Sequence, residues 1–178
     1  MTSTTTNTNT SVARPAIFFD RDGVLNQDQG YVYKIKDWQW IDGAINTIKH
    51  CNERNYFVFI VTNQSGIGRG FYSEQDVNKL HQFMQDDLQQ YGANIDDIRY
   101  CPHHQDAMID KYQMTCNWRK PGPGMLLDLI AKWPIDRSRS VLVGDKESDI
   151  TAAQQAGIKG LLFEGGNLHH FLTAAAYL

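Results

Sequence analysis

The sequence predicts an α/β fold in which helices cover both faces of a doubly wound, mostly parallel β-sheet. Short runs of β-branched and aromatic residues alternate with longer helical patterns, and this succession is typical of open α/β sheets. The strand candidates are continuously apolar rather than alternating, as expected when both faces of a sheet are buried. Polar residues capable of chemistry follow three of these strands, and such sheets bind ligands at the carboxyl ends of their strands.

The expected strands are short and rich in residues that favour extended backbone. They span residues 16–20, 57–63, 98–101, 140–145 and 160–164. Helices are expected at about 42–54, 73–91, 122–132 and 148–156. In the second helix, Ser73 is a suitable N-cap, and apolar residues from Val77 to Tyr91 form one stripe. Gly92 and Gly157 follow the second and fourth helices, where a glycine commonly ends a helix.

The chain of 178 residues is expected to form one domain over residues 15–178, after a polar, disordered tail over residues 1–14. Its 17 basic and 20 acidic residues give a net charge of −3, which argues against nucleic acid as a partner. No apolar run reaches the roughly 20 residues of a membrane helix, and the tail lacks the apolar core of a secretory signal. The 3 cysteines indicate a reducing compartment. We therefore expect a cytoplasmic protein without a membrane partner.

Carboxylates gather where the predicted strands end. Asp20 ends the first strand and Asp22 follows two positions later, while Asp145 ends the fourth strand with Asp149 nearby. Like charges this close repel each other unless something neutralises them. Oxygen ligands around a small site suit Mg²⁺, which commonly bridges protein carboxylates and a substrate phosphate. The sequence therefore predicts a magnesium site that contains Asp20, Asp22 and Asp145.

The same carboxylates are compatible with phosphate chemistry. A carboxylate can attack phosphorus to form an aspartyl-phosphate, but it repels a phosphate dianion unless cations offset the charge. Lys120 in "NWRKPGPGM" is the candidate lysine, and Thr62 in "TNQSGIGRG" offers a hydroxyl beside backbone N–H groups. The glycines of the second stretch match neither the dinucleotide fingerprint nor the P-loop, which argues against a bound nucleotide cofactor.

Four motifs in order, "DRDG", "TNQSG", "RKP" and "GDKESD", resemble those of the haloacid dehalogenase (HAD) superfamily of phosphohydrolases. The resemblance covers residues 16 to about 164 and implies a Rossmann-like fold without a large cap domain. It implies that Asp20 is the nucleophile and that Asp22 is the general acid and base, with its backbone carbonyl on Mg²⁺. Thr62 and Lys120 would complete the catalytic set, and Asp145 would bind the metal.

Within this superfamily, the stretches "DQGYV", "WIDGAI", "YCPHH" and "RKPGPGM" resemble those of the heptose bisphosphate phosphatases, with histidinol-phosphate phosphatases as near relatives. The resemblance implies that the 7-phosphate of a D-glycero-D-manno-heptose 1,7-bisphosphate is hydrolysed in bacterial heptose biosynthesis. A compact enzyme of this kind is expected to be a monomer. Two arginines would hold the distal phosphate, since a guanidinium fork suits phosphate oxygens. The implied substrate-binding residues are Asn26, Asp28, Gly30, Tyr31, Asn63, Gln64, Ser65, Arg69, Arg119 and Lys146.

A structural zinc loop is a further feature that the resemblance implies, and here the sequence departs from the pattern. Relatives carry a Cys-x-His pair followed by Cys-x-Cys. This chain has Cys101, His103 and Cys116, but Trp118 occupies the fourth ligand position. A tetrahedral structural zinc site usually takes four protein ligands. The sequence therefore leaves zinc open, with His104 or Asn117 able to complete the shell only by local rearrangement.

Other functions compete with the sugar bisphosphatase. Within enzymes these are a histidinol-phosphate phosphatase and a phosphatase of DNA 3′ ends, the second disfavoured because the sequence has no basic stripe. A receiver domain is the alternative of another class, but receivers lack the residue between an acidic pair after the first strand, here Arg21. A catalytically inactive sugar-phosphate binding module is disfavoured because every catalytic position is filled. For Asp149 and Lys146 the sequence leaves two roles open: each can belong to the active site or be an ordinary charge at a helix end or in solvent.

Overall fold

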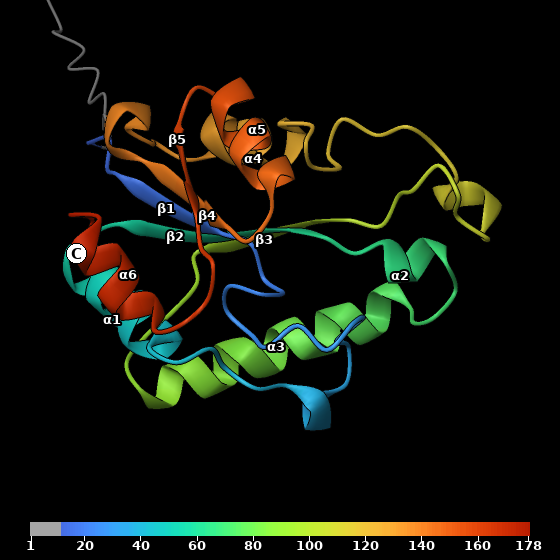
Figure 1. Ribbon diagram of the computed structural model, residues 1–178, viewed down its shortest axis with the longest axis horizontal. Helices are drawn as coiled ribbons and strands as arrows, with labels where there is room; N and C mark the ends of the chain where they lie inside the picture. The colour runs from blue at the N-terminus through green and yellow to red at the C-terminus, as the bar shows by residue number, and fades with distance from the viewer. Residues whose placement is uncertain (1–11) are drawn as a thin grey trace, which may run out of the picture.

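A computed structural model describes residues 12–178 of the chain (Figure 1). One sheet of five strands, all parallel, has the order β3-β2-β1-β4-β5, and the predicted doubly wound α/β fold is confirmed. The sequence predicted a mostly parallel sheet, and within the described residues every strand pair of this sheet is parallel. The strands are β1 (Ala16–Phe19), β2 (Phe57–Asn63), β3 (Asp97–Cys101), β4 (Val141–Gly144) and β5 (Lys159–Leu162).

The helices include two that periodicity does not predict, α2 and α6. α2 is only four residues long and α6 only seven, so neither is long enough to show a clear 3.6-residue pattern. The sequence does contain one signal for α6, since Asn167 is a favoured N-cap residue. In the structure its side chain accepts a hydrogen bond from the His170 N–H at 3.0 Å. The helices are α1 (Ala44–Glu53), α2 (Ser65–Gly68), α3 (Glu74–Gln90), α4 (Gly124–Lys132), α5 (Glu147–Gln155) and α6 (Leu168–Ala174), with 3₁₀ turns at Ile35–Asp37, Asp110–Tyr112 and Arg137–Arg139.

Helices lie on both faces of the sheet, with α4 and α5 on one side and α1, α3 and α6 on the other (Figure 1). Successive residues of a strand point to opposite faces. In β1, Ile17 and Phe19 accordingly join the apolar cluster with α1, α3 and α6, whereas Ala16 and Phe18 join the cluster with α4 and α5. All four side chains are fully buried, which explains why this strand reads as continuously apolar.

Most of the tail predicted over residues 1–14 lies outside the described residues. Arg14, its last member, is nevertheless part of the folded structure. Its N–H donates to the Pro134 carbonyl at 2.9 Å, and its guanidinium carbon lies 3.6 Å from the centroid of the Phe57 ring. The folded part therefore includes at least one residue before the predicted boundary.

The strand order brings the loops that follow β2, β1 and β4 next to one another. Phe19 of β1 is in register with Ile60 of β2 and with Val143 of β4, so the next residues of all three strands emerge at one edge. Asp20, Thr62 and Asp145 therefore meet there although they are far apart in the chain. Among the described residues, no helix has the length and apolar character needed to cross a membrane.

Candidate active site

A cavity of about 520 Å³ opens at this edge of the sheet. Most of the residues predicted for catalysis and substrate binding line it. Four further residues line it that the sequence-based site did not include: Tyr72, Pro121, Ser148 and Asp149. The predicted residues on its wall are Asp20, Asp22, Asp28, Gly30, Tyr31, Thr62, Asn63, Gln64, Ser65, Arg119, Lys120 and Lys146.

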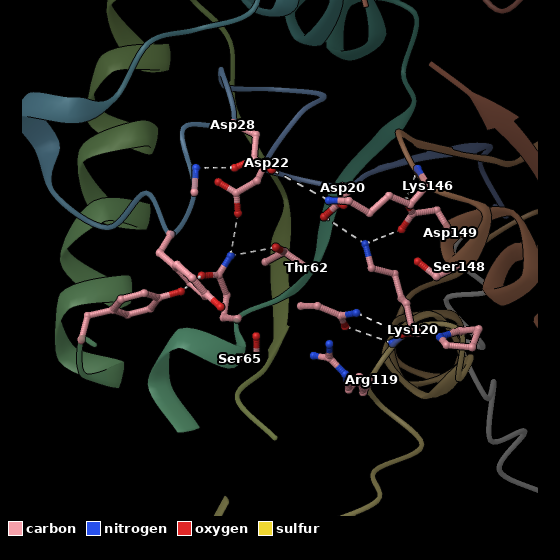
Figure 2. A pocket seen from close by; sticks show the side chains of 16 residues that line it. Asp20, Asp22, Asp28, Thr62, Ser65, Arg119, Lys120, Lys146, Ser148 and Asp149 are labelled. Carbon is pink, nitrogen blue, oxygen red and sulfur yellow. Dashed lines mark hydrogen bonds and ion pairs between the residues drawn. The ribbon is translucent and has the colours of Figure 1, made fainter. Parts of the chain in front are cut away.

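Lys120 lies between two buried carboxylates (Figure 2). Its Nζ is 2.9 Å from Asp20 Oδ1 and 2.6 Å from Asp149 Oδ1, and it also donates to the Val61 carbonyl at 2.8 Å. Burial disfavours the charged ammonium, but the two carboxylates outweigh that effect and raise the pKa of Lys120. The lysine therefore remains a cation in the floor of the cavity.

One ammonium does not neutralise all the carboxylates around it. Burial raises the pKa of Asp20 to about 6, Lys120 opposes this rise, and the negative charge of Asp149 adds to it. Burial likewise raises the pKa of Asp145. Carboxylate oxygens of Asp20, Asp145 and Asp149 all lie within 4.8 Å of one another. This cluster carries more negative charge than Lys120 offsets.

The surroundings of Asp145 fit a hard cation. Its Oδ1 is buried and has no hydrogen-bond partner within the described structure, so an oxygen lone pair is left unused. Gly23 has a φ of +86°, and a Cβ there would lie 2.4 Å from Asp145 Oδ2, so only glycine leaves room for the carboxylate. Clustered carboxylate oxygens with an orphaned acceptor are the donor set that Mg²⁺ prefers. The residues present therefore fit the predicted magnesium site.

Asp22 is oriented differently from the grouping predicted by the sequence. Its side chain is not part of the carboxylate cluster, where Asp149 takes its place. Arg21, which is fully buried, donates through Nη2 to Asp22 Oδ2 at 2.8 Å and Oδ1 at 3.0 Å. Asn26 Nδ2 donates to Asp22 Oδ1 at 3.0 Å, and Gln64 Nε2 donates to Oδ2 at 2.9 Å. Asn26 does not line the cavity; it holds Asp22.

His81 completes the support behind Asp22. Its Nε2 lies 3.4 Å from Arg21 Nη1, and burial together with the Arg21 charge lowers the pKa of His81 to about 3. The ring is therefore neutral beside the guanidinium at ordinary pH. Arg21 also donates to the Val32 carbonyl at 2.6 Å, so the arginine cannot swing away without leaving buried polar groups unpaired.

The end of β2 presents polar groups to the cavity and anchors Lys120. Asn63 Nδ2 donates to the Lys120 carbonyl and the Lys120 N–H donates to Asn63 Oδ1, both at 3.0 Å. The two bonds join the end of β2 to the loop before α4. Thr62 is almost fully buried, and its hydroxyl oxygen accepts from Gln64 Nε2 at 2.9 Å.

Basic side chains lie around the rim of the cavity. Lys146 Nζ is 3.4 Å from Asp145 Oδ2 and 3.9 Å from Asp28 Oδ2. Arg119 points into the cavity (Figure 2). Arg69 does not line it, but its charge is near enough to help lower the pKa of Arg119, after the larger effect of burial. The two predicted arginines are therefore neighbours.

The three predicted zinc ligands also come together. Ligand atoms of Cys101, His103 and Cys116 lie within 4.8 Å of one another, and Cys101 Sγ is 3.7 Å from His103 Nδ1. Trp118 cannot ligate a metal. It packs instead on the cluster beneath α4, where a Cβ on Gly124 would lie 2.6 Å from Trp118 Cδ1. The structure therefore brings three potential ligands together, while the residue at the fourth position of the motif packs beneath α4.

A parallel sheet, with an aspartate directly after its central strand and a buried lysine beside it, is the arrangement that the resemblance to HAD-like phosphohydrolases predicts. A family model described as HAD-hydrolase-like matches residues 117–175, the segment that contains Lys120, Asp145 and Asp149. Together with relatives that are named phosphatases, this match confirms the predicted enzyme type, a hydrolase of phosphoric monoesters.

Similarity to individual proteins narrows the class. The chain is 49% identical over 159 residues to D-glycero-beta-D-manno-heptose-1,7-bisphosphate 7-phosphatase of Rhodopseudomonas palustris, covering 89% of this chain and 88% of that protein. It is 43% identical to the D-glycero-alpha-D-manno-heptose-1,7-bisphosphate 7-phosphatase of Burkholderia mallei, covering 80% and 76%. The crystal structure of D,D-heptose 1,7-bisphosphate phosphatase from B. bronchiseptica, complexed with magnesium and phosphate, matches with 34% identity and a TM-score of 0.77, covering 90% and 86%. The chain belongs to the family of heptose-1,7-bisphosphate 7-phosphatases.

Asp149 is the main site residue that the sequence left undecided. Its Oδ2 accepts from the Lys146 N–H at 3.1 Å, so it does cap the first turn of α5. Its other oxygen meets Lys120 at 2.6 Å. Asp149 therefore caps α5 and also pairs with the buried lysine, and its place at the end of the "GDKESD" motif was the signal in the sequence.

Replacing Lys120 by methionine tests the charge balance of the cluster. We expect Lys120→Met to destabilise the metal-free protein by about 3–5 kcal/mol at pH 8, because two buried carboxylates lose their partner. The folded-state pKa of Asp20, already about 6, would rise further, so folding would favour the protonated acid even more. The loss of stability should therefore be smaller at pH 5, where Asp20 is protonated, and grow as the pH rises through 6.

Urea unfolding in EDTA at pH 5 and pH 8 measures this effect. The exposed Lys79, on α3, provides a matched Lys→Met control that should change stability little at either pH. An equal cost of Lys120→Met at both pH values would contradict the charge-balance interpretation.

Proposed function

We propose that this chain hydrolyses the 7-phosphate of a D-glycero-D-manno-heptose 1,7-bisphosphate in a Mg²⁺-dependent reaction that serves bacterial heptose biosynthesis. The observation that carries the proposal is the ion pair of Lys120 with Asp20 beside the under-neutralised carboxylates of Asp145 and Asp149. This arrangement suits a nucleophilic carboxylate that must accept a phosphate dianion. Family membership supports the sugar substrate.

The first half-reaction transfers the phosphoryl group to the protein. An oxygen of Asp20 attacks phosphorus and the bond between phosphorus and the sugar oxygen breaks, while the departing oxygen takes a proton from Asp22. To carry that proton, one Asp22 oxygen gives up a hydrogen bond that it accepts here and turns its O–H toward the departing oxygen. Lys120, 2.9 Å from Asp20, offsets charge at the point of attack. The Thr62 hydroxyl and the N–H groups at the start of α2 are available to the phosphate oxygens.

The second half-reaction releases phosphate. The carboxylate of Asp22 takes a proton from a water molecule, the water oxygen bonds to phosphorus, and the bond to Asp20 breaks. Inorganic phosphate leaves, and both aspartates return to their starting forms. General acid and base help of this kind contributes roughly 10²–10⁴-fold to the rate.

Magnesium, when bound, would neutralise charge on the phosphate and hold it against the nucleophile. Asp20 and Asp145, together with the backbone carbonyl of Asp22, are the proposed ligands. Asp149 supports the site from behind, through Lys120. A structural relative that is complexed with magnesium and phosphate supports this assignment.

The second phosphate of the substrate would meet the basic rim. Arg119 is the proposed ligand within the cavity, with Arg69 behind it and Lys146 across the opening. Asp28, Gly30 and Tyr31, also on the wall, are the proposed contacts to the sugar. Relatives are named for the β anomer and for the α anomer, so the proposal covers both anomers of the bisphosphate.

Steady-state kinetics on a panel of phosphate esters tests the substrate. We expect the highest kcat/KM with one anomer of the heptose 1,7-bisphosphate, release of the 7-phosphate alone, and complete loss of turnover in EDTA that Mg²⁺ restores. The panel includes histidinol phosphate and a short oligonucleotide with a 3′-phosphate. Preference for either of these, or turnover without a divalent cation, would overturn the proposal.

Replacing Asp20 tests the nucleophile. We expect Asp20→Asn to lower kcat by roughly 10⁴-fold or more, because the amide cannot form the acyl phosphate, while the protein stays folded. Asp42→Asn, an exposed aspartate before α1, is the matched control and should keep wild-type turnover. The readout is phosphate release together with thermal unfolding, and substantial release by a folded Asp20→Asn protein would assign the nucleophile elsewhere.

We also propose that Cys101, His103 and Cys116 bind zinc only weakly, because the fourth protein ligand is replaced by Trp118. We expect less than one zinc per chain in protein purified without added metal. Trp118→Cys should raise the content to about one per chain by completing the four-ligand set, whereas Trp118→Ala should not. Stoichiometric zinc in the unmodified chain would contradict this proposal.

The cytoplasmic location and the monomeric state stay predictions from the sequence.

A further inference from the structure

The amide of Gln64 connects two groups of the proposed active site. Its Nε2 donates to Asp22 Oδ2 and to Thr62 Oγ1, each at 2.9 Å. Gln64 is almost fully buried, so both donors of the amide are used within the protein. One side chain therefore sets the position of the general acid and base and also that of a phosphate-binding hydroxyl.

The bond to Thr62 also decides which way its proton points. A hydroxyl that accepts a hydrogen bond from Gln64 cannot direct its own hydrogen at that donor. The Thr62 hydrogen is therefore free to turn toward the cavity, where it can donate to a phosphate oxygen. Rotating the amide by half a turn would place its carbonyl oxygen against the Asp22 carboxylate, which is an unfavourable contact between two acceptors.

Tyr72 holds the other end of this amide. Its hydroxyl donates to Gln64 Oε1 at 2.7 Å, and burial raises the pKa of the Tyr72 hydroxyl above its usual range, so it stays a donor. Without that hydroxyl, the buried Oε1 would have no partner among the described residues, since no other donor bonds to it. A buried, unsatisfied amide would tend to rotate into the cavity, where water can reach it.

The Tyr72 ring is itself fixed from two sides. It stacks on Tyr33, with ring centroids 4.8 Å apart and an interplanar angle of 17°. It also occupies the space that a side chain on Gly66 would need, since a Cβ there would lie 2.2 Å from the ring. The glycine of the "TNQSG" motif therefore makes room for the tyrosine.

We infer that Tyr72 is a positioning residue for phosphate transfer, whose hydroxyl locks the Gln64 amide so that it orients Asp22 and Thr62 together. The inference rests on the proposed function, since it assumes that these two residues act in the reaction. Tyr72 stands outside the four sequence motifs, and its hydroxyl is directed at the Gln64 amide. Its effect is therefore expected on the rate of the chemical step rather than on substrate binding.

The test is Tyr72→Phe, which keeps the ring and removes only the hydroxyl. We expect kcat to fall roughly tenfold, the loss expected from a small misplacement of catalytic groups, with KM nearly unchanged. Tyr33→Phe removes a hydroxyl from the other ring of the same stack and should leave kcat unchanged. Thermal unfolding of both variants reports whether the fold is intact.

A double substitution separates positioning from a general structural effect. In a Gln64→Leu background the amide is gone, so adding Tyr72→Phe should cause little further loss of kcat. Unchanged kcat in Tyr72→Phe, a change confined to KM, or the full loss repeated in the Gln64→Leu background would each overturn the inference.

The kinetics are measured on the heptose bisphosphate and on a simple alkyl phosphate. If the wild-type chain hydrolyses only the simple ester, the substrate assignment fails while the Tyr72 inference is still tested on that ester. If the bisphosphate is hydrolysed and Tyr72→Phe is fully active, the inference alone fails.

Discussion

The ammonium of Lys120 is the interaction on which the rest of the site depends. A lysine this deeply buried is costly unless it is paired, and a buried cluster of carboxylates is costly unless it is neutralised. Placing Lys120 between Asp20 and Asp149 relieves both costs but leaves a net negative charge. That residual negative charge is what the proposed divalent cation would offset.

The polar side chains of the site form two separate networks, and the first is the one around Lys120. Asp22 belongs to a second network, in which a buried guanidinium, an asparagine and a glutamine amide hold its two oxygens. The two aspartates of the "DRDG" motif are thereby given different environments, although only one residue separates them. Neighbouring carboxylates in unlike surroundings can divide the roles of nucleophile and proton carrier.

Strand-end motifs predicted which residues meet, because parallel strands bring the residues after them to one edge. They predicted Asp20, Thr62 and Asp145 together, and the sheet confirms their proximity. Motif spacing does not encode which way a side chain turns, so the orientation of Asp22 toward Arg21 was not predictable. Tyr72 was missed for a related reason, since its role depends on a long-range stack with Tyr33 and on the absence of a Cβ at Gly66. The elements α2 and α6 were too short for periodicity to reveal.

The paired hydrogen bonds between Asn63 and the Lys120 backbone have a consequence for how the ammonium is held in place. The excursion over residues 102–119 leaves the sheet after β3 and returns at a point pinned to β2. The two bonds tie the end of this excursion to the central part of the sheet. Because Asn63 holds the Lys120 backbone directly, the place of the ammonium depends on β2 more than on the length of this excursion.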